Sequence, residues 1–268
     1  MNPLISVDQL AAAPTDTRIF DIRWDLTDPE KGRVTYQAGH IPGAVFVDLD
    51  EDLSTQRDGG GRHPLPDIED FAVTLGKLGV TPDSHVVVYD DVSGKIAARM
   101  WWMLRAIGHH QVQVLDGGYQ AWIAAGGDVG VGNVKPETTD PYPVPRAFRG
   151  VASREELDNR ALLDARAEER YRGEVEPVDP KAGHIPGAIN IPTHFNLAED
   201  GRFLPGEELA SLYSHLPKNT VVSCGSGVTA CHDALAMVLA GREMPEVYVG
   251  SFSEWSRLDL PIATGSDP

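Results

Sequence analysis

The sequence predicts an α/β protein made of two similar halves, each with a mostly parallel sheet flanked by helices on both faces. Short runs rich in β-branched residues alternate with longer segments of helical period, and this alternation is typical of parallel sheets. A set of short motifs also occurs twice along the chain, in the same order. The alternation therefore predicts the fold class, and the repetition predicts that the fold occurs twice.

The strands and helices of the first half follow from its pattern of apolar residues. Between residues 94 and 107, apolar side chains recur at spacings of three and four, as they do on one face of a helix. Short β-branched runs between such segments indicate strands. The predicted strands cover residues 19–21, 45–47, 86–89 and 112–115, and the predicted helices cover residues 68–78, 94–107 and 119–125.

The clearest repeat is the sequence AGHIPGA, which occupies residues 38–44 and again residues 182–188. One such identity can arise by chance, but further matches in the same order indicate a duplicated domain. The other matched segments are residues 19–23 with 162–166, 86–90 with 220–224, and 115–122 with 248–255.

The two halves are joined by a stretch in which glycines between residues 126 and 132 are followed by prolines between residues 136 and 145. This composition is typical of an extended linker on the surface. A chain of 268 residues is long enough for two domains, each with its own core. We expect a first domain over residues 1–135, a linker over 136–149 and a second domain over 150–268.

The composition restricts the compartment and the partners. No apolar run approaches the length of a membrane span, and the first residues lack the pattern of a signal peptide. With only two cysteines, a disulfide framework is not expected, and a reducing, cytoplasmic setting fits. The net charge of −17 argues against nucleic acids and anionic membranes as partners. An anionic substrate would therefore need a local cationic patch.

One cysteine stands where a predicted strand gives way to a predicted helix. Cys224 follows the strand-like residues 220–222 and precedes a helix expected over 230–240. Ligands of open α/β sheets bind outside the carboxyl ends of the strands. Backbone N–H groups and the helix N-terminus favour negative charge there, so the position suits a reactive thiolate. We interpret Cys224 as a nucleophile.

The loop that follows this cysteine has the sequence GSGVTA. Its glycines permit positive φ and a close approach of the backbone to a ligand, and its hydroxyl groups add hydrogen-bond donors. With Ser226 beside the nucleophile, the candidate ligand-binding residues of the loop are Gly225, Gly227, Val228 and Thr229.

The corresponding loop of the first half has Asp90 where the second half has Cys224. Only the second half is therefore expected to carry thiolate chemistry. The other cysteine, Cys231, falls on the predicted helix after the loop, and we interpret it as a packing residue. His40 and His184 belong to the duplicated AGHIPGA motif, and we interpret them as structural.

The tandem halves, the duplicated GHIPGA and the loop CGSGVTA resemble the two-domain rhodanese-type sulfurtransferases over essentially the whole chain. The Gly-Ser-Gly after Cys224 is similar to that of 3-mercaptopyruvate sulfurtransferases, whereas thiosulfate-specific rhodaneses usually carry Arg-Lys-Gly there. The resemblance implies tandem rhodanese-like domains of which the second is catalytic. It also implies transfer of a sulfane sulfur through a Cys224 persulfide, with no metal or organic cofactor.

The same resemblance implies a small anionic donor, 3-mercaptopyruvate, and a thiol acceptor such as thioredoxin or a small thiol, or cyanide. An arginine of the second domain holds the donor's anionic end in this family, and it maps to Arg170. Many mercaptopyruvate enzymes carry another arginine slightly downstream. This sequence has none there, and Arg172 or Lys181 could substitute.

Mercaptopyruvate enzymes are also proposed to use a Ser–His–Asp relay beside the cysteine. The matching residues are Ser226, His63 and Asp50. A histidine there could move protons near neutral pH. Because His63 and Asp50 come from the first half of the sequence, the relay predicts a site to which both halves contribute.

Three other functions stay open at this stage. A thiosulfate:cyanide sulfurtransferase would use the same cysteine with another donor. A persulfide carrier would accept one sulfur and pass it to a dedicated partner. A phosphatase of the related Cys-x5-Arg type needs an arginine in the loop, but the sixth residue after Cys224 is Ala230, so this function is disfavoured.

Overall fold

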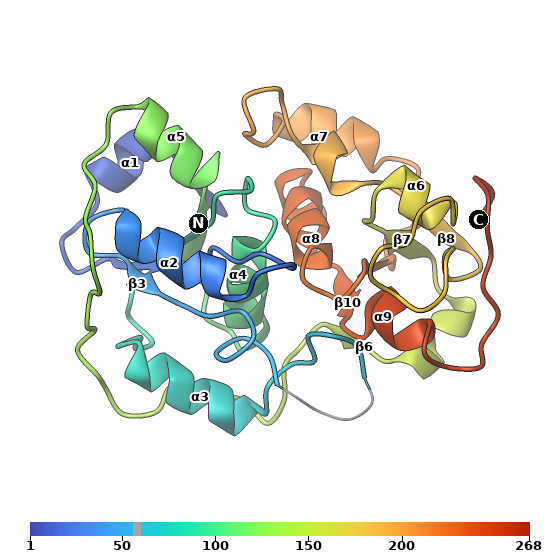
Figure 1. Ribbon diagram of the computed structural model, residues 1–268, viewed down its shortest axis with the longest axis horizontal. Helices are drawn as coiled ribbons and strands as arrows, with labels where there is room; N and C mark the ends of the chain where they lie inside the picture. The colour runs from blue at the N-terminus through green and yellow to red at the C-terminus, as the bar shows by residue number, and fades with distance from the viewer. Residues whose placement is uncertain (56–59) are drawn as a thin grey trace. The chain divides into compact units, whose positions relative to one another are not determined.

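The computed structural model describes residues 1–55 and 60–268, which form two compact units (Figure 1). The second unit includes residues 60–65 from the first half of the sequence, and the first unit includes residues 136–149, which we expected as a linker. The extent of each independently folding domain stays a prediction. Unit 1 contains Met1–Thr55, Pro66–Arg149 and Glu199–Arg202, and unit 2 contains residues 60–65, Gly150–Ala198 and Phe203–Pro268.

Unit 1 is built on a five-stranded sheet with the order β1-β5-β4-β2-β3, in which every pair of neighbouring strands is parallel. The central strand β4 is buried along its whole length, which is why its sequence is a continuous apolar run. The strands are β1 (Leu4–Ile5), β2 (Arg18–Asp21), β3 (Val45–Phe46), β4 (Val86–Tyr89) and β5 (Val112–Leu115).

The helices of unit 1 flank this sheet. Helix α4 is the most deeply buried, and the side chains of Trp101 and Trp102 on it are fully enclosed. The helices are α1 (Val7–Ala11), α2 (Glu30–Ala38), α3 (Ile68–Lys77), α4 (Ala97–Ala106) and α5 (Gly118–Ala124).

Unit 2 repeats this architecture with the sheet order β6-β10-β9-β7-β8, again with parallel neighbours. Its strands are β6 (Val151–Ala152), β7 (Leu162–Asp164), β8 (Ala188–Asn190), β9 (Val221–Ser223) and β10 (Glu246–Tyr248). Its helices are η1 (Arg154–Asn159), α6 (Glu168–Tyr171), η2 (Thr193–Asn196), α7 (Gly206–Leu212), α8 (Ala230–Leu239) and α9 (Ser251–Trp255).

Each unit has one sheet of parallel strands flanked by helices, which confirms the predicted fold class. The predicted strands of the first half all lie within or beside observed ones. The prediction lacks β1, α1 and α2, and it starts α4 too early. That helix begins at Ala97 instead of Gly94, because residues 90–96 form a loop whose N–H groups bind the Asp90 carboxylate.

The duplicated GHIPGA motif has the same structure in both units. In unit 1 the ring of His40 stacks on Tyr36 at 4.3 Å between centroids, and its Nδ1 lies 2.9 Å from the Tyr36 carbonyl. In unit 2 the ring of His184 stacks on Tyr171 at 3.7 Å, with the same contact at 2.8 Å. Both histidines are buried, so they act as packing residues, as the sequence predicts.

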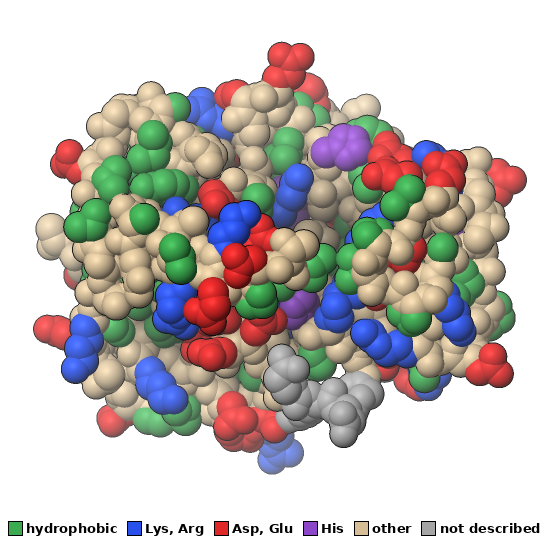
Figure 2. All heavy atoms as spheres, viewed as in Figure 1, with side chains coloured by type: hydrophobic (Ala, Val, Ile, Leu, Met, Phe, Trp, Pro, Cys, Tyr) green, Lys and Arg blue, Asp and Glu red, His purple; other side chains and the backbone are tan. Residues whose placement is uncertain are grey.

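Acidic and basic side chains are mixed over the face drawn in Figure 2. Within residues 1–55 and 60–268, no helix has both the length and the apolar character needed to cross a bilayer.

Candidate functional site

The candidate site of unit 2 is a loop between a buried strand and a helix. Strand β9 ends at Ser223, and α8 begins at Ala230. Cys224, the first residue of the loop, is only 1% exposed. The N–H of Gly227 donates to Cys224 Sγ over 3.1 Å, so the loop folds back on its own sulfur. This arrangement supplies a backbone donor to a thiolate or to a sulfur bound to it.

A glycine at position 227 is required by the geometry of this loop. Gly227 has φ +76°, in the left-handed region, and a Cβ built on it would lie 2.4 Å from the Val249 carbonyl oxygen. The rest of the loop is enclosed as well. Val228 is buried, and Thr229 is half-buried at the start of α8.

Two guanidinium groups lie beside Gly225. A Cβ built on Gly225 would lie 2.9 Å from Nη2 of Arg62 and 3.6 Å from Nη1 of Arg170. Arg170 is on α6, as the resemblance implies, but Arg62 was not among the predicted residues. The pair places guanidinium N–H donors beside the loop, and a guanidinium can bind a carboxylate through two hydrogen bonds.

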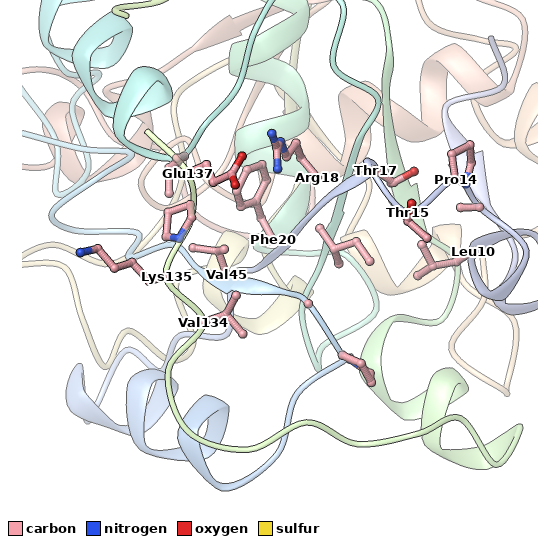
Figure 3. A pocket seen from close by; sticks show the side chains of 16 residues that line it. Leu10, Pro14, Thr15, Thr17, Arg18, Phe20, Val45, Val134, Lys135 and Glu137 are labelled. Atoms are coloured by element: carbon pink, nitrogen blue, oxygen red, sulfur yellow. The ribbon is translucent and has the colours of Figure 1, made fainter. Parts of the chain in front are cut away.

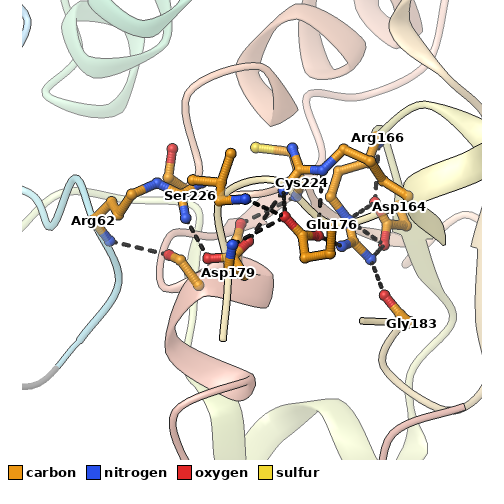
Figure 4. A network of polar contacts seen from close by, with 12 residues as sticks. Arg62, Asp164, Arg166, Glu176, Asp179, Gly183, Cys224 and Ser226 are labelled. Atoms are coloured by element: carbon orange, nitrogen blue, oxygen red, sulfur yellow. Dashed lines mark hydrogen bonds and ion pairs between the residues drawn. The ribbon is translucent and has the colours of Figure 1, made fainter. Parts of the chain in front are cut away.

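Two carboxylates hold these guanidinium groups (Figure 4). Arg170 Nη2 donates to Glu176 Oε1 over 2.7 Å and to Asp179 Oδ2 over 3.2 Å. Arg62 Nη1 donates to Asp179 Oδ1. Burial raises the pKa of Glu176, but hydrogen bonds from Arg170 and from backbone N–H groups outweigh it, so the pKa lies below its ordinary value.

A further arginine in Figure 4 has a structural explanation. Arg166 donates to Asp164 and to the Gly183 carbonyl, and its guanidinium lies 3.9 Å from the centroid of the Phe252 ring. In unit 1, Arg23 makes the same contacts with Asp21, the Gly39 carbonyl and the ring of Tyr119. Because the arrangement occurs in both units, we assign it to the fold and not to the candidate site.

The predicted histidine and serine are brought together. His63 Nδ1 lies 2.8 Å from Ser226 Oγ, and both side chains are buried. Although His63 comes from the first half of the sequence, it belongs to unit 2. Asp50 belongs to unit 1, where its Oδ2 accepts a hydrogen bond from Trp24 Nε1 over 2.8 Å. The role of Asp50 in a relay stays a prediction.

The two residues considered as a second donor-binding cation make other contacts. Arg172 bonds the carboxylate of Glu174 at an exposed position, and Lys181 Nζ donates to the Leu258 carbonyl over 2.7 Å. The second cation beside the loop is Arg62 instead. In the sequence, only its position next to His63 could have drawn attention to Arg62, because its approach to Gly225 depends on the tertiary fold.

The second cysteine of the chain contacts the backbone of the Cys224 loop. Cys231 is fully buried on α8, and its Sγ donates to the Gly227 carbonyl over 3.3 Å. This contact fits the interpretation of Cys231 as a structural thiol.

In unit 1 the equivalent loop encloses a carboxylate of the chain itself. Asp90 Oδ1 accepts from the N–H groups of Val92 and Gly94, and Oδ2 accepts from those of Ile96 and Ala97, over 2.7 to 2.9 Å. The N–H groups that could bind an external anion are therefore occupied by Asp90.

Unit 1 also contains a cavity of about 400 Å³, which Figure 3 shows from close by. It is lined by Arg18 and Val45, the first residues of β2 and β3, so it lies at the opposite end of the strands from the Asp90 loop. Its wall includes Pro42 and Gly43 of the duplicated turn, and a cavity in unit 2 includes the matching Pro186 and Gly187. We attribute both cavities to the repeated fold. Across residues 1–55 and 60–268, no cluster of three or more His, Cys, Asp or Glu side chains is arranged to hold a metal ion.

Comparison with known proteins identifies the family. The model of the rhodanese-like domain matches the chain twice, over residues 6–125 and 151–258. The chain is 45% identical to a Pseudomonas aeruginosa protein named "Probable 3-mercaptopyruvate sulfurtransferase", and the match covers 98% of each. It is 36% identical to the thiosulfate sulfurtransferase of Rattus norvegicus, over 91% of this chain and 86% of the rat protein.

A solved structure agrees with these sequence matches. The 3-mercaptopyruvate sulfurtransferase from Leishmania major superimposes with a TM-score of 0.88 at 31% identity, covering 96% of this chain and 75% of that chain.

Proposed function

The chain belongs to the rhodanese family, and from that premise we propose that it transfers a sulfane sulfur from 3-mercaptopyruvate to a thiol or cyanide through a persulfide on Cys224. The observation that carries the proposal is the position of Cys224. Its sulfur accepts an N–H from its own loop, and the next residue, Gly225, lies against two guanidinium groups. A nucleophile and an anion-binding group are therefore placed next to each other.

In the first half-reaction, the Cys224 thiolate attacks the sulfur of the donor. A new S–S bond forms, the C–S bond of 3-mercaptopyruvate breaks, and its electron pair remains on carbon as the enolate of pyruvate. The enolate takes a proton, pyruvate leaves, and Cys224 is left as a persulfide. Arg62 and Arg170 would bind the donor carboxylate, and the N–H of Gly227 would stabilise the sulfur.

In the second half-reaction, an acceptor removes the outer sulfur. Cyanide attacks it to give thiocyanate, and the S–S electron pair returns to Cys224 as a thiolate. With two thiols, the products are a disulfide, hydrosulfide and the free cysteine. Both routes restore the starting enzyme, which fits a ping-pong scheme.

The pair of Ser226 and His63 is suited to the proton steps. The 2.8 Å contact between His63 Nδ1 and Ser226 Oγ allows a proton to pass between them. Ser226 follows Cys224 by two residues and belongs to the same loop. We propose that this pair moves the donor's thiol proton, with Asp50 as the third member.

Steady-state kinetics on the purified chain distinguish between the two candidate donors. We expect kcat/KM with cyanide as acceptor to be higher for 3-mercaptopyruvate than for thiosulfate. Thiosulfate is the second candidate, because the chain is also 36% identical to a protein named thiosulfate sulfurtransferase. A higher kcat/KM for thiosulfate would replace our choice of donor with this alternative.

The acceptor and the compartment are proposed from the chemistry and the composition. We propose a thiol acceptor such as thioredoxin or a small thiol in the cytoplasm, where two free cysteines stay reduced. Multiple turnovers with a small thiol would support an enzyme. A single transfer that requires a dedicated protein would support a persulfide carrier.

A further inference from the structure

The carboxylates of Glu176 and Asp179 are buried against the guanidinium groups that flank Gly225. The side chain of Asp179 is fully enclosed, and that of Glu176 is 4% exposed. The guanidinium groups are more open, with the side chains of Arg62 and Arg170 18% and 20% exposed. The carboxylates therefore lie behind the cations, which face the loop.

Different nitrogens of the two arginines face the carboxylates and the loop, while Arg62 Nε is buried and makes no hydrogen bond. Arg62 Nη1, and Nε and Nη2 of Arg170, donate to the carboxylates. Arg62 Nη2 and Arg170 Nη1 are the nitrogens closest to Gly225. Asp179 bonds both arginines at once, so it fixes the two guanidinium groups side by side. One terminal nitrogen of each arginine then lies beside Gly225, the residue after Cys224.

The formal charges of this cluster cancel. Besides Arg170, Glu176 also bonds Arg166 over 3.5 Å, and Arg166 is itself paired with Asp164. Three guanidinium groups therefore face three carboxylates, and an incoming anion meets N–H donors in a fixed arrangement but no surplus of positive charge. A monoanion that accepts two N–H groups suits such a site. A second negative charge on the ligand would be repelled by the buried carboxylates without an additional cation to offset it.

We propose that Asp179 and Glu176 are positioning and specificity-determining residues that make the site prefer monoanionic donors over dianionic ones, an inference that rests on the proposed sulfur transfer at Cys224. They hold the guanidinium groups in place and cancel their charge. A keto-carboxylate such as 3-mercaptopyruvate then binds better than thiosulfate, which carries two negative charges.

The test compares two unreactive anions on the full chain at one ionic strength. Pyruvate serves as the monoanion and sulfate as the dianion, and their dissociation constants are measured by titration calorimetry. For the unmodified chain we expect pyruvate to bind more tightly than sulfate. Asp179→Asn, which removes one carboxylate charge, should shift the ratio of the two constants toward sulfate by about tenfold. Glu176→Gln should shift it in the same direction.

The matched control is Glu174→Gln. Glu174 lies in the same segment and also bonds an arginine, but Glu174 is exposed, its partner Arg172 is half-buried, and the two form another ion pair. Removing its charge should leave the sulfate-to-pyruvate ratio within about twofold. This control separates the local effect of Asp179 from the change in net charge.

Each result decides the inference. Tighter binding of sulfate than pyruvate by the unmodified chain would overturn it, and so would an unchanged ratio in a folded Asp179→Asn protein. Circular dichroism reports folding, and Glu176→Gln decides the matter if Asp179→Asn does not fold. If the unmodified chain transfers no sulfur from either donor, the proposed function fails, while the ratio of dissociation constants still tests the charge preference.

Discussion

The loops at Asp90 and Cys224 occupy the same position in two units of the same fold, but they differ in what they surround. The Asp90 loop gives four backbone N–H groups to a carboxylate of the chain itself. The Cys224 loop gives one to a sulfur, and it lies beside the guanidinium groups of Arg62 and Arg170. In the first case the N–H groups stabilise the fold. In the second, the Gly227 N–H faces the sulfur that we propose as the nucleophile. On this proposal, the exchange of Asp for Cys at one position separates a structural loop from a reactive one.

The largest effect is expected from Cys224→Ser. Sulfur transfer should fall at least about a thousandfold, because a serine hydroxyl cannot form the persulfide. The thermal stability of the protein should change little, since only the sulfur is exchanged. Steady-state rates and a thermal melt measure the two effects. Cys231→Ser is the matched control, because a serine can keep the hydrogen bond to the Gly227 carbonyl, and its activity should be retained.

The next effect concerns the cations that distinguish the Cys224 loop. Arg170→Ala should raise the KM for the donor by about 10- to 100-fold, since a charge-assisted, two-point contact is lost. Arg172→Ala is the control, because Arg172 is a half-buried arginine paired with the exposed Glu174. A KM for Arg170→Ala equal to that of the Arg172 variant would remove Arg170 from the site.

The Asp90 loop is tested by stability instead of activity. Asp90→Asn should lower the free energy of unfolding of unit 1 by about 1–3 kcal/mol, because an amide presents its NH2 group to backbone N–H groups that lose their acceptor. Denaturant unfolding measures the change, with the exposed Asp83→Asn as a control in the same unit. Unaltered stability in Asp90→Asn would mean that the four hydrogen bonds do not hold the loop.

The smaller predictions concern pH, and the first is for unit 1. Burial lowers the pKa of His109 from its ordinary value of 6.5, and its Nδ1 lies 3.0 Å from the Tyr142 hydroxyl. The unfolded chain therefore binds a proton at a higher pH than the native one. The contribution of His109 to the stability of unit 1 is fully present above pH 6.5. It falls as the pH drops toward the lowered pKa, by up to about 1.4 kcal/mol per pH unit. His109→Gln should remove this part of the acid sensitivity in denaturant titrations.

Unit 2 should respond in the opposite direction through Asp233. Burial raises the pKa of Asp233 well above its ordinary value of 3.8, and Asn196 Nδ2 donates to its Oδ1 over 2.7 Å. As the pH rises above 3.8, the unfolded chain loses its proton first, so the stability of unit 2 falls until the raised pKa is passed. Asp233→Asn keeps an acceptor for Asn196 and should stabilise unit 2 at neutral pH. A less stable Asp233→Asn protein at pH 7 would contradict this sign.

The features that could be predicted from the sequence are those that depend on local pattern. The duplicated motif and the β-branched runs were sufficient for the parallel sheets, and the run after residue 222 was sufficient to locate Cys224 between β9 and α8. The short elements β1, α1 and α2 were missed because a few residues give little periodicity.

The features that were missed depend on tertiary contacts. The sequence predicts a start of α4 that is too early, because the apolar spacing of a helix already begins in residues whose N–H groups bind the Asp90 carboxylate. Arg62 and Asp179 lie 117 residues apart in the chain, so no local pattern relates them. Arg62 can pair with Asp179, which also bonds Arg170, because the fold brings the segment containing Arg62 into unit 2.

The central claim is that the Cys224 loop carries the transferred sulfur and the Asp90 loop carries none. Mass spectrometry of the full chain after exposure to 3-mercaptopyruvate tests it most directly. We expect one added sulfur, about 32 Da, located by peptide mapping on Cys224 and lost on addition of cyanide. A chain that gains no sulfur, or gains it on Cys231 alone, would contradict the account.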